Sequence, residues 1–408
     1  MQPLSAMPPP SPCWVERGSP AYRRISTALF LAGFATFSLL YCVQPLLPVL
    51  AKDFTVGPAE SSLALSLSTG LLALAILGAA VVSESLKRRS LMFGSVVAAS
   101  LLNIAVAVAP DWRLLLVLRA LEGFALGGVP AVAMAYLAEE MAPKGLGLTM
   151  GLYISGTAFG GMTGRVITGI LADALSWRWA MAILGLIGLA AAAGFIALLP
   201  HSRNFTPKSG FDLRYHLRAW TGHLRGPALP LLFAIGFLTM GAFVAVYNFV
   251  GFHLMGPPFG LNQSDLGLIF TVYIFGIVAS SAAGAASDRF GRHLVLPTGI
   301  LVCGLGMVLT LVPGLSGMIA GIALLTFGFF MTHAVASGWV GRAATQAKAH
   351  ASSLYLLAYY LGSSTAGSAA GWFWAEDGWP AVIGFTLALE ALALVAALRL
   401  YQQARPTV

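Results

Sequence analysis

Ser287-Asp-Arg-Phe-Gly-Arg-His293 is a short charged stretch between two long apolar runs, residues 264–286 and 294–312. A helix that crosses the hydrocarbon core of a bilayer needs about 20 predominantly apolar residues, and both runs are close to that length. The stretch therefore predicts two transmembrane helices joined at one side of a membrane.

The composition favours a membrane environment for the whole chain. Hydrophobic residues make up 58% of the 408 residues and charged residues only 9%, against roughly 25% charged residues in a soluble domain. The net charge is +8, but the basic residues form short clusters between apolar runs, so they do not make one face for nucleic acid. Both a water-soluble fold and a nucleic-acid partner are excluded.

Twelve apolar runs are long enough to cross a bilayer. The first six are residues 25–51, 60–82, 90–109, 112–138, 146–172 and 179–200, and the second six are residues 229–254, 264–286, 294–312, 317–342, 351–374 and 381–400. The polar segment between these sets is the only connection long enough to be a linker.

This pattern predicts an all-α polytopic membrane protein with two pseudo-symmetric six-helix bundles. The predicted parts are a disordered cytoplasmic tail (1–24), the N-terminal bundle (25–200), a cytoplasmic linker (201–228), the C-terminal bundle (229–401) and a second cytoplasmic tail (402–408).

Lysine and arginine positions predict the orientation, because these residues accumulate on the cytoplasmic side of a membrane. If the N-terminus is inside, most of the 23 basic residues lie in the tails, the linker and the loops on that side. The opposite loops hold only Lys52, Arg113 and Arg178. We therefore expect a multi-pass protein of a bacterial inner membrane with both termini in the cytoplasm.

The two halves also match each other in sequence. Ser83-Glu-Ser-Leu-Lys-Arg-Arg89 has the same place in the first half as Ser287–His293 has in the second, 204 residues further on. The other matches are Gln44 with Asn248 at the same offset and Leu152-Tyr153 with Leu354-Tyr355 at an offset of 202. Parallel repeats that rock about a site between them give alternating access.

With this topology, the chain resembles the major facilitator superfamily from about Tyr22 to Leu400. The residues that carry the resemblance are Gly284-x-x-x-Asp288-Arg289-x-Gly291-Arg292, which match the family's loop motif. The fifth run is similar to the antiporter motif of proton-coupled drug efflux members, with Gly147, Gly156, Gly160, Gly161 and Gly164.

That motif is imperfect here, because its proline is Gly161 and its closing glycine is Arg165. Close packing of helices is an alternative explanation of the glycine spacing. The chain as a whole is similar to the twelve-span drug:proton antiporters and to the YnfM-type branch, to which arabinose efflux is ascribed.

By this resemblance the loop motif implies a gate on the cytoplasmic side. Asp288, beside Arg289 and Arg292, can pair with Arg342 at the end of the tenth run, and this contact must break when the halves rock. Alternatively, the positive residues serve only the orientation rule.

The first half departs from the motif. Glu84 replaces the aspartate and the glycine is missing. The basic residues of this loop can instead meet Glu139 or Glu140; they are Lys87, Arg88 and Arg89.

Ionisable residues inside the runs are costly in lipid, so they are functional candidates. Arg119 and Glu122 are three residues apart on the fourth run and share a helix face. Arg119 and Gly123 also match the family's R-x-x-x-G motif, which implies a proton-coupling region with Glu122 as proton carrier. The alternative is a static neutralising pair. Glu390 on the twelfth run is either a second acid or a helix-packing contact.

Arg165 and Gln44 lie at a similar depth and could line one cavity with Arg119. Two buried arginines there would suit an anionic or hydroxyl-rich substrate better than a cationic drug. Each could instead bond a neighbouring helix. The remaining candidates for substrate contacts are Tyr41, Tyr153, Tyr247, Asn248, His333 and Tyr355, with aromatic packing or a fixed hydrogen bond as alternatives.

The sequence thus predicts a secondary active transporter that exports a small solute in exchange for protons and opens its site alternately to each side of the membrane. Uptake by proton symport and an uncoupled facilitator or channel stay open as alternatives. We expect no metal or cofactor other than the proton gradient, a monomer, and no enzyme activity, since the runs hold no paired nucleophile and base.

Overall fold

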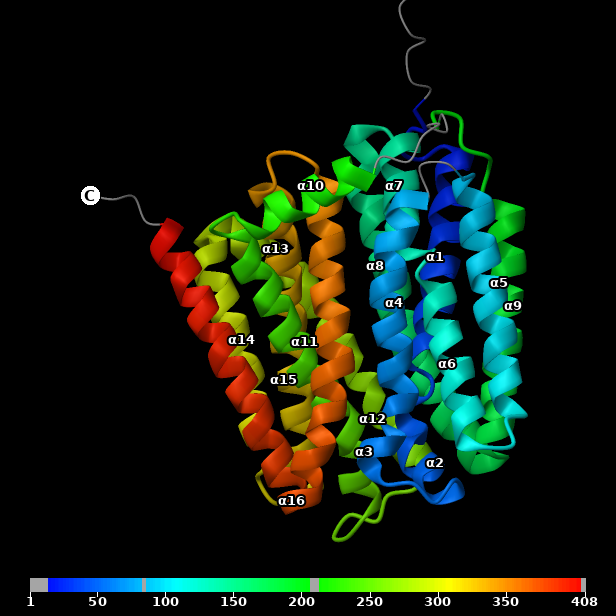
Figure 1. Ribbon diagram of the computed structural model, residues 1–408, viewed down its shortest axis with the longest axis vertical. Helices are drawn as coiled ribbons and strands as arrows, with labels where there is room; N and C mark the ends of the chain where they lie inside the picture. Colours follow the sequence, from blue (N-terminus) through cyan, green and yellow to red (C-terminus); the bar gives the residue numbers. More distant parts are fainter. Residues whose placement is uncertain (1–13, 83–85, 206–212, 405–408) are drawn as a thin grey trace, which may run out of the picture.

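The computed structural model describes residues 14–82, 86–205 and 213–404. Helices make up almost all of these ranges, and the only pairing of extended backbone in them is one isolated bridge between Val15 and Met141. The chain forms two side-by-side bundles of helices that run roughly parallel to the long axis (Figure 1).

The N-terminal bundle holds the first ten elements. They are α1 (Pro20–Tyr41), η1 (Gln44–Leu46), α2 (Leu47–Asp53), α3 (Pro58–Ser61), α4 (Leu63–Val82), α5 (Arg88–Ala107), α6 (Trp112–Leu126), α7 (Pro130–Glu140), α8 (Pro143–Ala174) and α9 (Trp177–Leu198). The linker contains one short helix, α10 (Leu213–Leu224).

The C-terminal bundle holds the remaining elements. They are α11 (Leu229–Met255), α12 (Gln263–Ile269), η2 (Phe270–Val272), α13 (Tyr273–Phe290), α14 (Arg292–Leu309), α15 (Leu315–Ala343) and α16 (Lys348–Ala404). Helix α16 is two helices joined at Asp377 and Gly378, where the backbone is not helical.

The described residues contain nine helical segments that are long and apolar enough to cross a membrane, and the segment of α16 comprises two spans. The two further spans are α6 with α7, which are separated at residues 127–129, and α8. The fold is therefore the predicted twelve-helix all-α membrane protein, and the predicted runs lie within a few residues of the observed helices.

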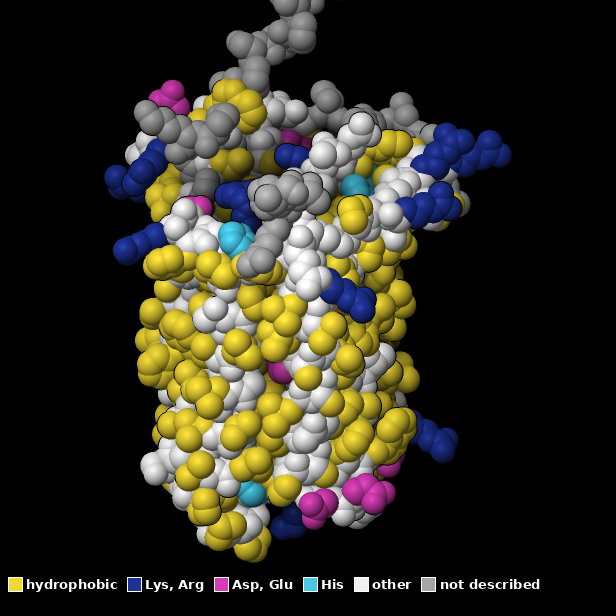
Figure 2. Space-filling model, turned by 90° about the vertical axis from the view of Figure 1, so that its left-hand side faces the viewer, with side chains coloured by type: hydrophobic (Ala, Val, Ile, Leu, Met, Phe, Trp, Pro, Cys, Tyr) yellow, Lys and Arg dark blue, Asp and Glu magenta, His cyan; other side chains and the backbone are white. Residues whose placement is uncertain are grey.

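The surface fits this assignment. Figure 2 shows one side of the molecule, with a broad band of hydrophobic side chains at mid-height and most of the visible lysines and arginines at the upper end. Helix α10, the start of α1 and the end of α16 lie at this same end, which we call the terminal face (Figure 1).

The first helix begins earlier than the sequence predicted. It starts at Pro20 instead of residue 25, because the Ser19 side chain accepts a hydrogen bond from the Tyr22 N–H and proline fits the first helical turn. Val15 exchanges backbone hydrogen bonds with Glu140 and Ala142. Residues 14–24 are thus ordered, which corrects the predicted disorder for that part of the tail; residues 1–13 lie outside the described ranges.

The first span is interrupted just beyond α1. Prolines 45 and 48 follow the end of α1 at Tyr41 and cannot donate the backbone hydrogen bonds that a continuous helix requires. A single 3₁₀ turn, η1, connects α1 with α2. The last carbonyl groups of α1 are therefore available to side chains of other helices.

Glycines on α8 allow it to pack directly on the backbone of α1. A Cβ atom at Gly156, Gly160 or Gly164 would overlap the backbone of Phe30, Phe34 or Ser38, respectively. The Ser38 hydroxyl donates a 2.9 Å hydrogen bond to the Gly160 carbonyl across this contact. The spacing of these three glycines thus permits close packing, as small residues do between helices in lipid.

Gly160→Ala should destabilise the protein by about 1–3 kcal/mol, because the added methyl group overpacks the α1 contact. Gly151→Ala on the same helix is the matched control, since a Cβ atom there would have no neighbouring atom within 4 Å. Helix propensity alone favours alanine over glycine by up to about 1 kcal/mol. Thermal unfolding in detergent micelles should show opposite shifts, and equal shifts would contradict the packing argument.

Candidate functional site

The two bundles are joined by side-chain hydrogen bonds toward the end opposite the terminal face, where α2, α3 and α12 lie (Figure 1). In the part of the chain that the structure describes, these bonds are Gln44 to Asn248 (2.7 Å), Gln263 to the Pro45 carbonyl (2.8 Å), Ser264 to Asp173 (2.8 Å) and Ser364 to the Ser66 carbonyl (2.7 Å). The bundles therefore contact each other firmly at this end.

One buried chain of polar contacts crosses between the halves. The Arg165 Nε donates to Gln44 Oε1 (2.7 Å), the Gln44 amide donates to Asn248 Oδ1 (2.7 Å), and the Asn248 amide donates to the Gly367 carbonyl (3.4 Å). Gln44 and Asn248 are equivalent in the sequence repeat at an offset of 204, and Arg165 and Gly367 at 202. Equivalent positions of the two halves thus meet at their shared boundary.

Arg165 is 1% exposed and lies among aromatic rings from both halves. Its guanidinium carbon is 4.3 Å from the ring centre of Tyr41, 4.6 Å from that of Tyr273 and 5.3 Å from that of Phe270. Its Nη1 also donates to the Gly161 carbonyl (2.6 Å). Ring faces attract a cation, and more strongly where water is excluded.

The second buried arginine forms an ion pair. Arg119 Nη1 is 2.6 Å from Glu122 Oε2, and both side chains are fully buried. The same guanidinium donates to the carbonyls of Leu39 (3.2 Å) and Leu40 (2.7 Å) at the end of α1 and of Ala64 (3.1 Å) at the start of α4. Arg119 therefore holds two broken helix ends together, while Glu122 Oε1 has no hydrogen-bond partner.

Gly123 allows this arrangement, because a Cβ atom there would overlap the backbone of Ser68 on α4. The Ser68 hydroxyl donates to the Arg119 carbonyl at 2.8 Å. Close contact between α4 and α6 thus depends on the glycine of the R-x-x-x-G pattern.

Glu390 is placed apart from these groups. It lies on α16, is 3% exposed, and contacts the Cys303 thiol of α14 at 3.5 Å. Its Oε2 has no hydrogen-bond partner, and no ion pair of the described residues includes it. It is therefore a buried acid without a cation beside it.

Three of the predicted tyrosines and His333 have different surroundings. The Tyr247 hydroxyl bonds Thr326 Oγ1 at 2.7 Å, and the Tyr355 hydroxyl bonds His333 Nδ1 at 3.0 Å. The Tyr153 hydroxyl is buried without a partner. Tyr247 belongs to the same aromatic cluster as the rings around Arg165, through stacking on Phe270.

In the first half, the loop motif contacts the ends of the fourth and sixth spans. Arg88 pairs with Glu139 at 2.5 Å, and Arg89 contacts His201 and the Ile196 carbonyl. Glu140 instead accepts hydrogen bonds from residues 202–204. Lys87 is exposed, Gly147 lies within α8, and Glu84 lies outside the described residues.

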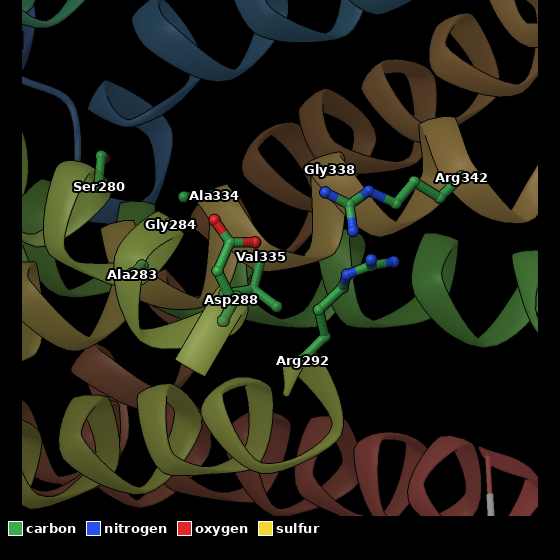
Figure 3. Close-up of a pocket in the computed structure, with 10 residues that line it drawn as sticks. Ser280, Ala283, Gly284, Asp288, Arg292, Ala334, Val335, Gly338 and Arg342 are labelled. Carbon is green, nitrogen blue, oxygen red and sulfur yellow. The ribbon is translucent and has the colours of Figure 1, made fainter. Parts of the chain in front are cut away.

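In the second half, Asp288, Arg292 and Arg342 line one pocket of about 230 Å³ on the terminal face. Figure 3 shows these side chains on three helices, α13, α14 and α15, around the pocket. Asp288 takes part in none of the ion pairs of the described residues, so the predicted Asp288–Arg342 pair is not formed in this structure.

The remaining motif residues form the turn beside this pocket. Gly291 has φ +84°, a conformation that residues with a side chain rarely adopt, and it ends α13 one residue before α14 starts. Arg289 lies over the Phe290 ring, with 5.1 Å between the guanidinium carbon and the ring centre.

Sequence reasoning did not identify the rings that the second half places around Arg165. Phe270 begins the 3₁₀ turn η2 between α12 and α13, and Tyr273 begins α13. Phe243 and Phe329 stack nearby with 3.8 Å between ring centres. Aromatic residues are common in apolar runs, and periodicity there does not reveal which face points inward.

Comparisons with known proteins agree with this architecture. The model of the Major Facilitator Superfamily matches residues 29–256 and 249–408. The chain is 45% identical over 381 residues to the MFS-type transporter YybF of Bacillus subtilis (strain 168), covering 93% of this chain and 94% of that protein. It is 42% identical over 394 residues to the inner membrane transport protein YnfM of Escherichia coli (strain K12), covering 96% and 93%.

A solved structure has the same fold. The bacterial homologue of the human lysosomal transporter Spinster superposes with a TM-score of 0.76 at 14% identity, covering 94% of this chain and 97% of that one. Members of the family are transporters and not enzymes. The chain belongs to the major facilitator superfamily and is a multi-pass inner-membrane transporter of a small molecule.

Proposed function

We propose that this transporter exports a small solute in exchange for protons by alternating access, and that Glu122 carries the proton. The observation that carries the proposal is the fully buried Arg119–Glu122 pair beside the interrupted end of α1. Titratable groups at such depth are costly in a membrane protein, and an uncoupled pore has little need of them.

Protonation of Glu122 can change the pair without displacing Arg119, because the two residues differ in their number of hydrogen-bond partners. Glu122 has one bonded and one unbonded carboxylate oxygen, whereas Arg119 has three carbonyl partners in addition. Protonation of Glu122 removes the charge attraction but leaves Arg119 in place. The strength with which Arg119 holds the surrounding helix ends then changes with the state of Glu122.

This change can reach the boundary between the halves over a short distance. Arg119 bonds the carbonyls of Leu39 and Leu40, and Gln44 follows only a few residues later. Gln44 bonds Asn248 of the other half. The end of α1 thus contacts Arg119 on one side and leads to the Gln44–Asn248 bond on the other. A change at either site can therefore move this segment and affect the other site.

The direction of access follows from the proposed orientation. With both termini in the cytoplasm, as the basic residues favour, the bonded end of the two halves faces the periplasm. The structure then represents a state that is closed toward the periplasm. A single chain carries both halves of the site, so we propose that the monomer is the working unit.

Glu390 is a second candidate for protonation in the C-terminal half, since its carboxyl group has only a thiol beside it. The antiporter-like glycines and the resemblance to efflux members support export. Proton symport and uncoupled facilitation remain the alternatives, and the transport experiment separates them.

Glu122→Gln should reduce solute-driven proton movement to about a tenth or less, because an amide cannot take up a proton in place of the carboxylate. Purified protein in proteoliposomes with a pH-sensitive dye provides the measurement, with sugars, amino acids, organic anions and cationic drugs as solutes. Glu60→Gln is the control, since Glu60 is an exposed acid of the same half.

In the wild type, proton movement opposite to the solute supports antiport, and movement in the same direction means symport. Solute flux without any proton movement would reduce the Arg119–Glu122 pair to a structural element. Unchanged coupling in Glu122→Gln would exclude this residue as the carrier.

Asn248→Leu should shift the protein away from the state that is closed at the end opposite the termini. The lost Gln44–Asn248 hydrogen bond is worth about 1 kcal/mol, which is about a fivefold change in a two-state population. Cysteines introduced at Asp173 and Ser264, whose side chains bond at 2.8 Å, report this state through the yield of oxidative cross-linking.

Asn103→Leu is the matched control for this shift. Asn103 is also a buried amide, but it bonds the Met181 carbonyl within the N-terminal half. Loss of its bond should lower stability without changing the cross-linking yield. Equal yields in Asn248→Leu and the unmodified background would contradict a role of the Gln44–Asn248 contact in closing this end.

A further inference from the structure

Three arginines of the described residues are buried, and they differ in how their charge is balanced. Arg88 pairs with Glu139 and Arg119 pairs with Glu122. Arg165 is 1% exposed and belongs to no ion pair in these ranges. A buried guanidinium without a carboxylate is energetically unfavourable, because it has lost its hydration without gaining a counter-charge.

The groups around Arg165 are polar or aromatic but neutral. Gln44 and the Gly161 carbonyl each accept one hydrogen bond, and the rings of Tyr41, Tyr273 and Phe270 lie within 5.3 Å of the guanidinium carbon. These contacts offset part of the desolvation cost. They leave the positive charge itself uncompensated.

From this arrangement we infer that the transported solute is a small organic anion whose carboxylate binds Arg165. The inference rests on the proposed function, since it takes the boundary between the halves as the substrate site. A guanidinium binds a carboxylate through two parallel hydrogen bonds, which are stronger than bonds to neutral acceptors. The carboxylate would replace Gln44 or Gly161 as a partner of Arg165.

The surrounding rings indicate the shape of the anion's remaining part. Tyr41 comes from the first half, whereas Phe270 and Tyr273 come from the second, so a solute held here touches both halves. Ring faces favour a flat apolar body by stacking and by contact area. An anion with a planar, apolar body therefore fits this site.

The repeat indicates how many negative charges the solute carries. Gly367 is the equivalent of Arg165 in the second half, so the pseudo-symmetric position supplies no second cation. Arg119 is already neutralised by Glu122, and Glu390 lies at the contact of α14 with α16 beside Cys303. The single uncompensated charge favours a monoanion and disfavours a cation.

The same geometry connects binding with rocking of the halves. Gln44 is the acceptor for Arg165 and at the same time the donor to Asn248. A carboxylate that takes the place of Gln44 on Arg165 leaves this amide without one of its two partners. Binding of the anion therefore weakens the chain of contacts that joins the halves.

Binding of charge-matched probes to the purified protein tests the inference without any proton gradient. The probes are benzoate, benzamide and benzylamine, with hexanoate, hexanamide and hexylamine as aliphatic counterparts. We expect benzoate to bind at least about tenfold more tightly than benzamide, a difference of about 1.4 kcal/mol. Benzylamine should bind more weakly than both, and benzoate more tightly than hexanoate.

Arg165→Gln should remove the preference for benzoate over benzamide, whereas Arg165→Lys should keep part of it because the charge remains. Arg178→Gln is the control, since Arg178 lies on the partly exposed surface near Asp53. If Arg165→Gln does not fold, the wild-type selectivity and the Arg165→Lys variant still decide the question.

The inference is wrong if neither carboxylate binds the wild-type protein more tightly than its amide, or if Arg165→Gln keeps the full preference. Benzoate binding to Glu122→Gln separates the two proposals. A retained benzoate preference together with proton movement that does not depend on Glu122 would overturn only the proposed proton carrier. Coupled transport of a cation would overturn only the substrate class.

Discussion

A guanidinium inside the hydrocarbon layer must find all of its partners within the protein, and this constraint organises the boundary between the two bundles. Arg119 finds its partners in one carboxylate and three backbone carbonyls. Two of those carbonyls, of Leu39 and Leu40, are available because α1 ends before two prolines. The interruption of the first span and the buried charge thus depend on each other, since each would be unfavourable without the other.

The interruption also positions Gln44. A continuous helix would use the backbone of residues 42–46 for its own hydrogen bonds, whereas the 3₁₀ turn presents Gln44 at the boundary between the halves. Its amide bonds Arg165 on one side and Asn248 on the other. Local backbone chemistry in one span therefore creates a polar contact between the two halves.

The sequence predicted the twelve spans because hydropathy and length depend on residue type alone, and the repeat matched Gln44 with Asn248 before their contact was known. The contacts of single side chains were harder to predict. Asp288 and Arg342 line one pocket but form no ion pair in this structure, and the spacing of a loop motif does not fix the distance between two helix ends. The rings around Arg165 were not identified, because all-apolar helices do not encode which face turns inward.

Pseudo-symmetry alone gives two equal halves, and a transporter needs the differences between them. The polar chain that crosses the boundary begins at a charged side chain, Arg165, and ends at a backbone carbonyl, that of its repeat equivalent Gly367. The two amides between them, Gln44 and Asn248, are equivalent in the repeat and bond each other at 2.7 Å. The first half carries Arg165 and the Arg119–Glu122 pair, while the second half contributes the rings of Phe270 and Tyr273. Leu39, Leu40 and Gln44 all lie at or just beyond the end of α1, so in the proposed mechanism movement of this one segment would change the partners of Arg119 and the Gln44–Asn248 contact together.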